Sequence, residues 1–135
     1  MDYVLSDSDS YQYSQEEVDF YFANLDFTNL EKYALSIIAL NEIYARHGMK
    51  FERKTIQEYF NDTIWYEDKK IPQEEINSYL SNVELKNIDK LANVRKYYWE
   101  LCIGYSQVNK EKPKADDFQT YEYQEVMEEY SEEIN

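Results

Sequence analysis

Glycine and proline are scarce in this sequence, with two residues of each among 135. Many-stranded β folds need repeated tight turns, and these two residue types usually supply them. Their scarcity therefore favours helices. A chain of this length usually forms one compact core, and a hydrophobic fraction of 43% is enough to fill it. We expect an all-α fold, built as a small compact helical domain.

Cysteine and histidine each occur once, as Cys102 and His47. A single cysteine excludes an internal disulfide framework and gives no indication of the redox compartment. Within a helical segment, Cys102 is predicted to be a buried small apolar residue rather than a nucleophile. One histidine and one cysteine cannot form the nitrogen and sulfur cage of structural zinc. We expect neither a metal nor a cofactor.

Long apolar runs are absent, and no stretch approaches the roughly 18 apolar residues of a membrane span. The first twenty residues contain acids and no base, so they lack the positive start of a signal peptide. We expect the chain to be soluble as given. Membrane attachment would require an anchor that is absent from this chain.

Basic residues are few, and the net charge is −14. Residues 1–30 hold seven acids and no base, and residues 111–135 hold nine acids against two lysines. Residues 31–110 balance at twelve of each sign. Binding to nucleic acid or to an anionic membrane surface requires a basic face, so both partners are disfavoured.

Two capping-box patterns predict helix starts. Ser14 with Glu17 predicts a helix over about 15–24, and Thr28 with Glu31 predicts one over about 29–47. The second segment is apolar on more than one side, which is typical of a helix at the centre of its domain. The acidic stretch before the first helix, LSDSDS, is expected to be a solvated lead-in.

Three further segments complete the predicted fold. A short helix is expected over about 53–61, and Pro72 suits the first turn of another over about 73–80. Between them, Trp65 and Tyr66 are expected to anchor a loop onto the core. The longest pattern starts near Val83 and predicts a helix of up to 25 residues, with a bend near Gly104 left open. The total is about four to five helices.

The chain divides into a helical domain over residues 1–110 and an acidic C-terminal segment over residues 111–135. In that segment, Tyr123, Val126, Met127 and Tyr130 have the spacing of an amphipathic helix. Two alternatives stay open for it, a helix docked on the domain or a mobile tail.

The stretch YARHGMKF contains the one histidine beside an arginine and a glycine. Gly48 suits the left-handed residue just past a helix end, and Arg46 and His47 suit positions beside the last carbonyl groups. The catalytic alternative places a nucleophile and a carboxylate around His47. The sequence shows no nucleophile elbow, phosphate-binding glycine loop or HExxH helix, so we favour a structural role and no enzymatic activity.

Tyrosine is unusually abundant, with fifteen residues. Its flat ring and hydroxyl group suit recognition of sugars and peptides. Tyr97, Trp99 and Tyr105 form the candidate binding surface. The alternative is that these rings fill a small helical core.

The order of these segments resembles the YARHG domain, which is named for the motif at Tyr44–Gly48. The resemblance covers about residues 3–92. Its motif positions are Asn41, Glu42, Ile43, Tyr44, Ala45, Arg46, His47, Gly48, Phe51, Gln57, Tyr59, Phe60, Trp65 and Tyr66. The stretch SIIALNEI departs from the family by being more apolar before Asn41.

The resemblance implies an extracellular or cell-surface domain of a bacterium, often part of a lipoprotein or envelope protein, without a settled activity. We expect a non-enzymatic binding module that recognises a wall glycan, a peptide or an envelope protein through exposed aromatic residues. The alternative is an acidic inhibitor or nucleic-acid mimic, and an enzyme centred on His47 is less favoured.

Overall fold

The computed structural model describes residues 3–109, with side chains placed up to residue 102. The elements are α1 (Gln15–Ala23), α2 (Asn29–Arg46), α3 (Lys54–Asn61), the 3₁₀ helix η1 (Ile76–Tyr79) and α4 (Asn82–Asn109). No strand forms within this range, and the only β pairing there is an isolated bridge between Met49 and Ile71. The predicted all-α fold is confirmed. The C-terminal segment, with its two alternatives, lies outside the described residues.

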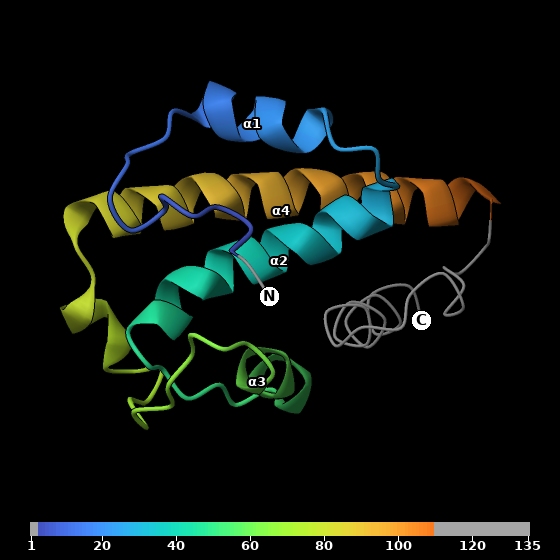
Figure 1. Cartoon of the computed structure of the whole chain (residues 1–135). Coiled ribbons are helices and arrows are strands. Elements are labelled where there is room, and N and C mark those ends of the chain that lie inside the picture. The colour runs from blue at the N-terminus through green and yellow to red at the C-terminus, as the bar shows by residue number, and fades with distance from the viewer. Residues whose placement is uncertain (1–2, 110–135) are drawn as a thin grey trace.

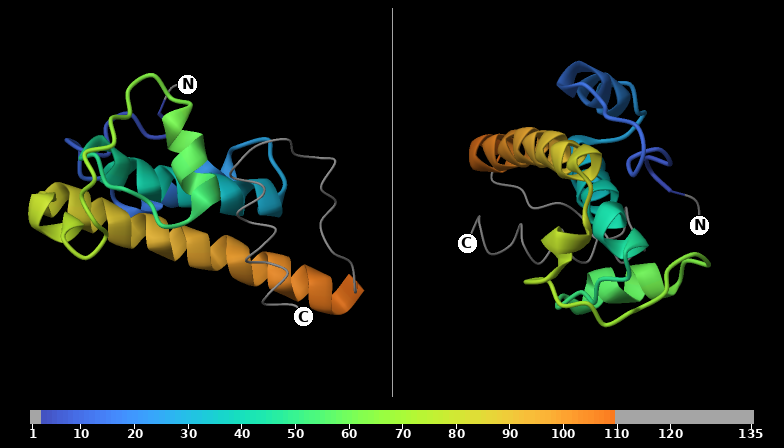
Figure 2. Two further views of the ribbon diagram at one scale, coloured as in Figure 1. Left: turned by 90° about the horizontal axis from the view of Figure 1, so that it is seen from below. Right: turned by 90° about the vertical axis from the view of Figure 1, so that its left-hand side faces the viewer.

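Helices α2 and α4 form an antiparallel pair at the centre of the domain (Figure 1). The rings of Tyr33 and Trp99 meet at one end of the pair, and His47 meets Glu84 at the other. Helix α1 packs against α4 on one side of the pair, and α3 lies on the opposite side (Figure 2). Helix α2 is therefore the central helix, as predicted.

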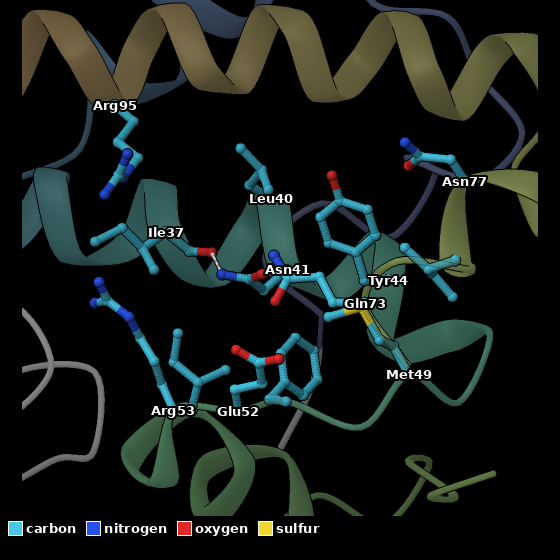
Figure 3. A pocket seen from close by; sticks show the side chains of 13 residues that line it. Ile37, Leu40, Asn41, Tyr44, Met49, Glu52, Arg53, Gln73, Asn77 and Arg95 are labelled. Atoms are coloured by element: carbon cyan, nitrogen blue, oxygen red, sulfur yellow. Dashed lines mark hydrogen bonds between the residues drawn. The ribbon is translucent and has the colours of Figure 1, made fainter. Parts of the chain in front are cut away.

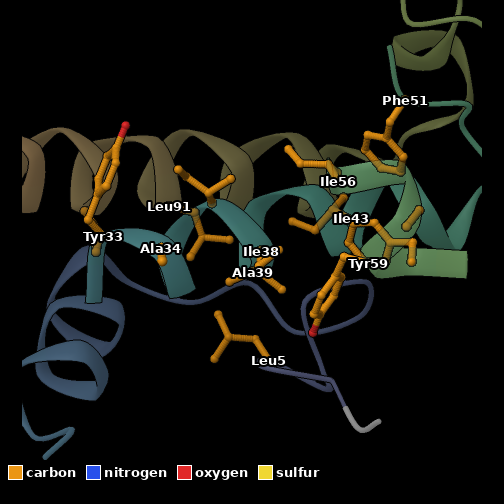
Figure 4. Packing of buried hydrophobic residues seen from close by; sticks show 14 of the residues in the cluster. Leu5, Tyr33, Ala34, Ile38, Ala39, Ile43, Phe51, Ile56, Tyr59 and Leu91 are labelled. Atoms are coloured by element: carbon orange, nitrogen blue, oxygen red, sulfur yellow. The ribbon is translucent and has the colours of Figure 1, made fainter. Parts of the chain in front are cut away.

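The core is centred on the buried face of α2. Ile38, Ala39 and Ile43 are almost completely buried there (Figure 4). Helix α4 adds Leu91 to this face, and the segment before α1 adds Leu5. Burial of each large apolar side chain stabilises the fold by about 1.5–3 kcal/mol, so the α2 face supplies much of the driving force for folding.

Local capping explains where the helices begin. Both predicted capping boxes form, at Ser14 with Glu17 and at Thr28 with Glu31. A third box begins α4, where the Ser81 hydroxyl accepts from the backbone N–H of Glu84 at 3.1 Å and the Glu84 carboxylate accepts from Ser81 N–H at 2.9 Å. Sequence analysis placed this start near Val83 and missed that box.

Two expected elements differ from the structure. The predicted helix over about 73–80 is wrong, because only η1 forms and its hydrogen bonds run from one residue to the third before it, as from Ser78 N–H to the Glu75 carbonyl. The chain leaves the helical conformation at Leu80, whose backbone is extended (φ −88°, ψ 141°) as it enters the Ser81 cap of α4. Helix α4 runs to 28 residues, and its helical backbone is continuous through Gly104.

Candidate functional site

Gly48 reverses the chain at the end of α2. Its φ is +85°, a conformation that side-chain-bearing residues rarely adopt. A Cβ at this position would lie 2.6 Å from Cγ of Lys69 and 2.9 Å from the carbonyl oxygen of Glu67. The Gly48 carbonyl in turn accepts from Lys69 N–H at 3.0 Å. Both the turn and the close approach of residues 67–69 thus require glycine, which confirms the predicted helix stop.

His47 connects the end of α2 to the start of α4. Its Nε2 lies 2.7 Å from Oε2 of Glu84, while the other oxygen of Glu84 accepts from Ser81 N–H. Glu84 is buried, and one carboxylate therefore serves both a helix cap and a long-range contact. Glu84 is thus the partner of His47 in its predicted structural role. The capping-box pattern Ser81-x-x-Glu84 was the signal in the sequence that marked Glu84.

Arg46 holds the N-terminal arm, which we define as residues 3–13. One guanidinium nitrogen donates to the Ser8 hydroxyl at 2.6 Å, and another donates to the carbonyls of Leu5 at 3.0 Å and Ser6 at 3.1 Å. The guanidinium also lies 4.3 Å from the ring centre of Tyr3, within range of a cation–π interaction. The planar fork of arginine suits this multiple contact.

Glu42 binds the same arm one helical turn earlier. Its carboxylate accepts from Val4 N–H at 2.7 Å and from Leu5 N–H at 3.3 Å. The residue is only 1% exposed. Burial raises the pKa of the Glu42 carboxyl to about 7, although these two hydrogen bonds and the charge of Arg46 lower it. The arm is thus fastened by a carboxylate that titrates near neutral pH.

A Glu42→Gln substitution is expected to remove a specific pH dependence of stability. Between the usual pKa of 4.5 and the folded value of about 7, the folded protein keeps a proton on Glu42 that the unfolded chain has lost. The free energy of unfolding therefore falls as pH rises through this window, by on the order of 3 kcal/mol in total. Urea unfolding of both proteins at pH 5 and pH 8 measures the difference, and parallel pH profiles would contradict it.

Helix α4 holds the other half of the arm through Asn87. Its side-chain oxygen accepts from Tyr13 N–H at 3.0 Å, and its amide nitrogen donates to the carbonyls of Ser8 at 2.9 Å and Tyr11 at 2.8 Å. Lys90 donates to the Tyr13 carbonyl. Asn87 is buried, and these three side-chain hydrogen bonds all go to the arm.

The expected solvated lead-in is confirmed for the exposed residues Ser6, Asp7, Asp9 and Ser10. It is wrong for Leu5 and Ser8, which are buried, and Leu5 points toward Ala39 of α2 (Figure 4). Side chains of α2 and α4 hold the backbone of this stretch, although most of its own side chains face water. No local pattern marked Glu42, Asn87 and Lys90 as the residues that bind it.

The motif residues after Gly48 form an aromatic cluster around α3. Phe51 stacks on Phe60 with ring centres 5.1 Å apart, and Tyr59 and Trp65 each pack edge-on against Phe60. Trp65 also contacts the ring of Tyr3 at 4.5 Å, which joins this cluster to the arm. Phe60 is the fully buried centre of the cluster.

Polar atoms fix the loop that carries Phe51. Gln57 accepts from Phe51 N–H at 2.8 Å and donates to the Tyr66 hydroxyl at 3.1 Å. The Tyr66 hydroxyl donates to the Met49 carbonyl at 2.6 Å. Trp65 and Tyr66 are half-buried against the core, so the predicted anchoring of their loop is confirmed.

An open pocket of about 540 Å³ lies between α2, α3, η1 and α4 (Figure 3). Three motif positions line it, namely Asn41, Tyr44 and Phe51. Arg53 at the start of α3 and Arg95 of α4 extend from opposite walls toward the end of the pocket near Ile37 (Figure 3). We call this the arginine end. Figure 3 also shows the Tyr44 hydroxyl pointing into the pocket.

The pocket walls provide further polar groups. Gln73 and Asn77 are exposed and face the pocket from the η1 side. Within the described range, neither side chain makes an internal hydrogen bond, and the same is true of the Tyr44 hydroxyl. Asn41 is different, because its amide nitrogen donates to the Ile37 carbonyl at 2.9 Å. Sequence analysis missed this pocket, because residues more than fifty positions apart form it.

The three aromatic residues predicted to bind a ligand do not share one surface. Tyr97 is 57% exposed on α4, whereas Trp99 is half-buried against Tyr33 at 5.0 Å. Positions two apart on a helix face nearly opposite directions, which explains the split. The side chain of Tyr105 lies outside the described residues.

The remaining candidate reactive group is the thiol of Cys102 on α4. Cys102 is buried, as predicted, and burial raises the pKa of its thiol to about 11, so the neutral thiol dominates at physiological pH. In the part of the chain that the structure covers, no cluster of three His, Cys, Asp or Glu residues is placed to hold a metal ion.

Comparison with known proteins identifies the family. Across residues 3–109, no helix is long and apolar enough to cross a membrane. No curated protein and no solved structure matches the chain. The YARHG domain model matches residues 10–96, compared with the expected range of about 3–92. This match covers more than half of the sequence and includes the Gly48 turn, the aromatic cluster and the pocket. The chain therefore belongs to the YARHG domain family.

Proposed function

We propose that this chain is a non-enzymatic interaction module whose pocket binds a short peptide segment carrying a carboxylate. Domains of this family are generally associated with extracellular proteins, so the proposed partner is a wall peptide or an envelope protein at a bacterial surface. The observation that carries the proposal is that Asn41, Tyr44 and Phe51 of the family motif line an open pocket. Three positions of the motif thus belong to the candidate site.

The chemistry of the pocket supports a peptide ligand. Arg53 and Arg95 converge at one end, and arginine pairs bind carboxylates through strong charge-assisted hydrogen bonds. The amides of Gln73 and Asn77 can donate to and accept from a peptide backbone. Phe51 is buried against Phe60, which leaves the half-buried Tyr44 as the one ring of the lining that a sugar could contact.

The environments of His47 and Cys102 support a role without catalysis. The His47 ring is engaged by Glu84, whose second oxygen caps α4, so this pair joins two helix ends. The Cys102 thiol is buried and carries a raised pKa, which opposes formation of a reactive thiolate. The proposed function uses neither residue as a reacting group.

The acidic-mimic alternative finds less support in the described residues. A mimic of nucleic acid needs its carboxylates arrayed on one outer face. Glu42 and Glu84 are instead buried, and Asp9 lies 3.7 Å from Arg46. The acids of residues 3–109 therefore serve internal contacts as well as the surface.

An Arg95→Gln substitution is expected to weaken peptide binding by about tenfold or more, because a hydrogen bond to a charged group contributes about 1.5–3 kcal/mol. Lys96→Gln is the matched control, since it removes the same charge from the neighbouring exposed position outside the pocket. The probes are stem peptides and peptide-free glycan chains prepared from bacterial wall, with calorimetry for affinity and NMR shifts for the location.

Binding of the stem peptides with shifts at Tyr44 and Asn77 would support the proposal. Binding of the glycan alone, or shifts centred on Tyr97, would return the site to the exposed aromatic residues. An equal loss in both variants would indicate general charge attraction. Failure of every wall fragment to bind would overturn the proposed partner class.

A further inference from the structure

We infer that the acidic segment over residues 116–133 of this same chain binds at the arginine end of the pocket and competes there with an external peptide. The inference rests on the proposed function, because it assigns a built-in competitor to the same pocket. Three independent observations support it: the chemistry of the pocket, the sequence pattern of the segment, and the length of chain that separates them.

The arginine end offers both charge and apolar surface. Ile37 of α2 lies near the two arginine side chains, and Leu40 of α2 and Ile56 of α3 line the same pocket (Figure 3). Arg53 and Arg95 approach from opposite walls, so a carboxylate entering between them can reach both (Figure 3). The surface therefore suits a ligand with an apolar stripe flanked by acids.

The segment has that pattern. Residues 111–135 contain nine acids against two lysines, so the net charge is strongly opposite to that of the arginine pair. Its apolar residues recur at the spacing of one helix face, at Tyr123, Val126, Met127 and Tyr130. Glu125, Glu128 and Glu129 fall between and beside them. Helices of this kind commonly lay their apolar face into a groove.

The length of the chain permits the return. Helix α4 continues to Asn109, fourteen residues beyond Arg95, which is about 21 Å at the rise of an α-helix. Residues 110–115 span at most roughly 20 Å when extended. Asp116 and Asp117 are therefore the first acids whose distance along the chain permits contact with Arg95, and Pro113, which disfavours the interior of a helix, precedes them in the sequence.

Tethering makes even a weak contact effective. A short covalent linker gives a local concentration in the millimolar range, so a segment with a dissociation constant near 100 µM would occupy the pocket about nine-tenths of the time. An external peptide would then bind about tenfold more weakly than to an empty pocket. Opposite charges drive the contact, so its strength should decrease as salt increases.

The test uses the full chain and a synthetic peptide of residues 114–133 as the probe. One variant neutralises four acids of the segment by Asp116→Asn, Asp117→Asn, Glu128→Gln and Glu129→Gln. The matched control neutralises four exposed acids elsewhere by Glu16→Gln, Glu67→Gln, Glu74→Gln and Glu75→Gln. Calorimetry at low and high ionic strength gives the affinity, and NMR of the Ile37 methyl and the arginine side chains gives the location.

The probe is expected to bind the segment variant about tenfold more tightly than the wild-type chain or the control. Adding Arg53→Gln and Arg95→Gln to the segment variant should abolish that gain. Equal affinity of the probe for all three proteins would overturn the inference, and so would shifts away from the pocket. If wall peptides do not bind but the probe does, the proposed partner class is wrong and the inference about the acidic segment stands. If wall peptides bind the wild-type chain and the segment variant with equal affinity, the proposed partner class stands and the inference is wrong.

Discussion

Replacing Gly48 with alanine is expected to lower the free energy of unfolding by about 3–5 kcal/mol. The backbone conformation contributes part of this loss, because a left-handed residue with a side chain costs about 1–2 kcal/mol. Steric contact contributes the rest, because the new Cβ would lie 2.6 Å and 2.8 Å from side-chain atoms of Lys69 and 2.9 Å from the Glu67 carbonyl oxygen. That oxygen belongs to backbone held against the turn, so it has little freedom to move away.

Urea unfolding followed by tyrosine and tryptophan fluorescence measures the effect. Gly48→Asn separates the two causes, because asparagine tolerates positive φ better than alanine yet carries the same Cβ. Equal destabilisation of both variants would assign the loss to steric contact, whereas recovery in the asparagine variant would assign it to conformation. A Gly48→Ala protein as stable as wild type would contradict the account of the turn.

An Arg46→Ala substitution is expected to release the arm and to cost about 3 kcal/mol of stability. Three carbonyl and hydroxyl partners lose their donor, and the buried Glu42 carboxylate loses the positive charge nearby. Hydrogen exchange of the Val4 and Leu5 amides should rise far more than that of amides in α2. The pH window set by Glu42 should also move upward, since one of the influences that lower its pKa is gone.

Arg46→Lys is the matched variant, because it keeps the charge and removes the planar fork. We expect it to fall between wild type and Arg46→Ala in stability, with the Glu42 titration close to its original pH. If exchange at Val4 stays slow in Arg46→Ala, then Glu42 and Asn87 alone suffice to hold the arm, and the role assigned to Arg46 is wrong.

The helix boundaries were predictable where local chemistry determines them. The boxes at Ser14 and Thr28 locate the starts of α1 and α2 to the residue, and Gly48 locates the end of α2. Capping involves groups within four residues of each other, so a single sequence contains the complete pattern. The exception is Pro72, whose position suited an α-helix where only the 3₁₀ helix η1 forms before the chain becomes extended at Leu80.

The contacts that hold the N-terminal arm were not predictable in the same way. Val4 and Glu42 are 38 residues apart, and Ser8 and Asn87 are 79 apart. Neither pair has a characteristic separation in the sequence, because the residues of each pair meet only when the whole domain folds. A serine-rich acidic stretch looks the same whether water or buried side chains satisfy its backbone. The pocket of the candidate site was hidden for the same reason, since Arg53 is the N-cap residue of α3 and Arg95 belongs to α4.

The double use of Glu84 has a consequence for the cost of joining α2 to α4. A glutamate side chain loses considerable rotational entropy when a tertiary contact immobilises it. The capping box forms within the first turn of α4 and already restricts the Glu84 rotamer through Ser81. The carboxylate therefore meets His47 in a preorganised state, and most of the ordering has occurred before the helices dock. The capping box at Ser81 thus lowers the entropic cost of the contact between His47 and Glu84, which joins α2 to α4.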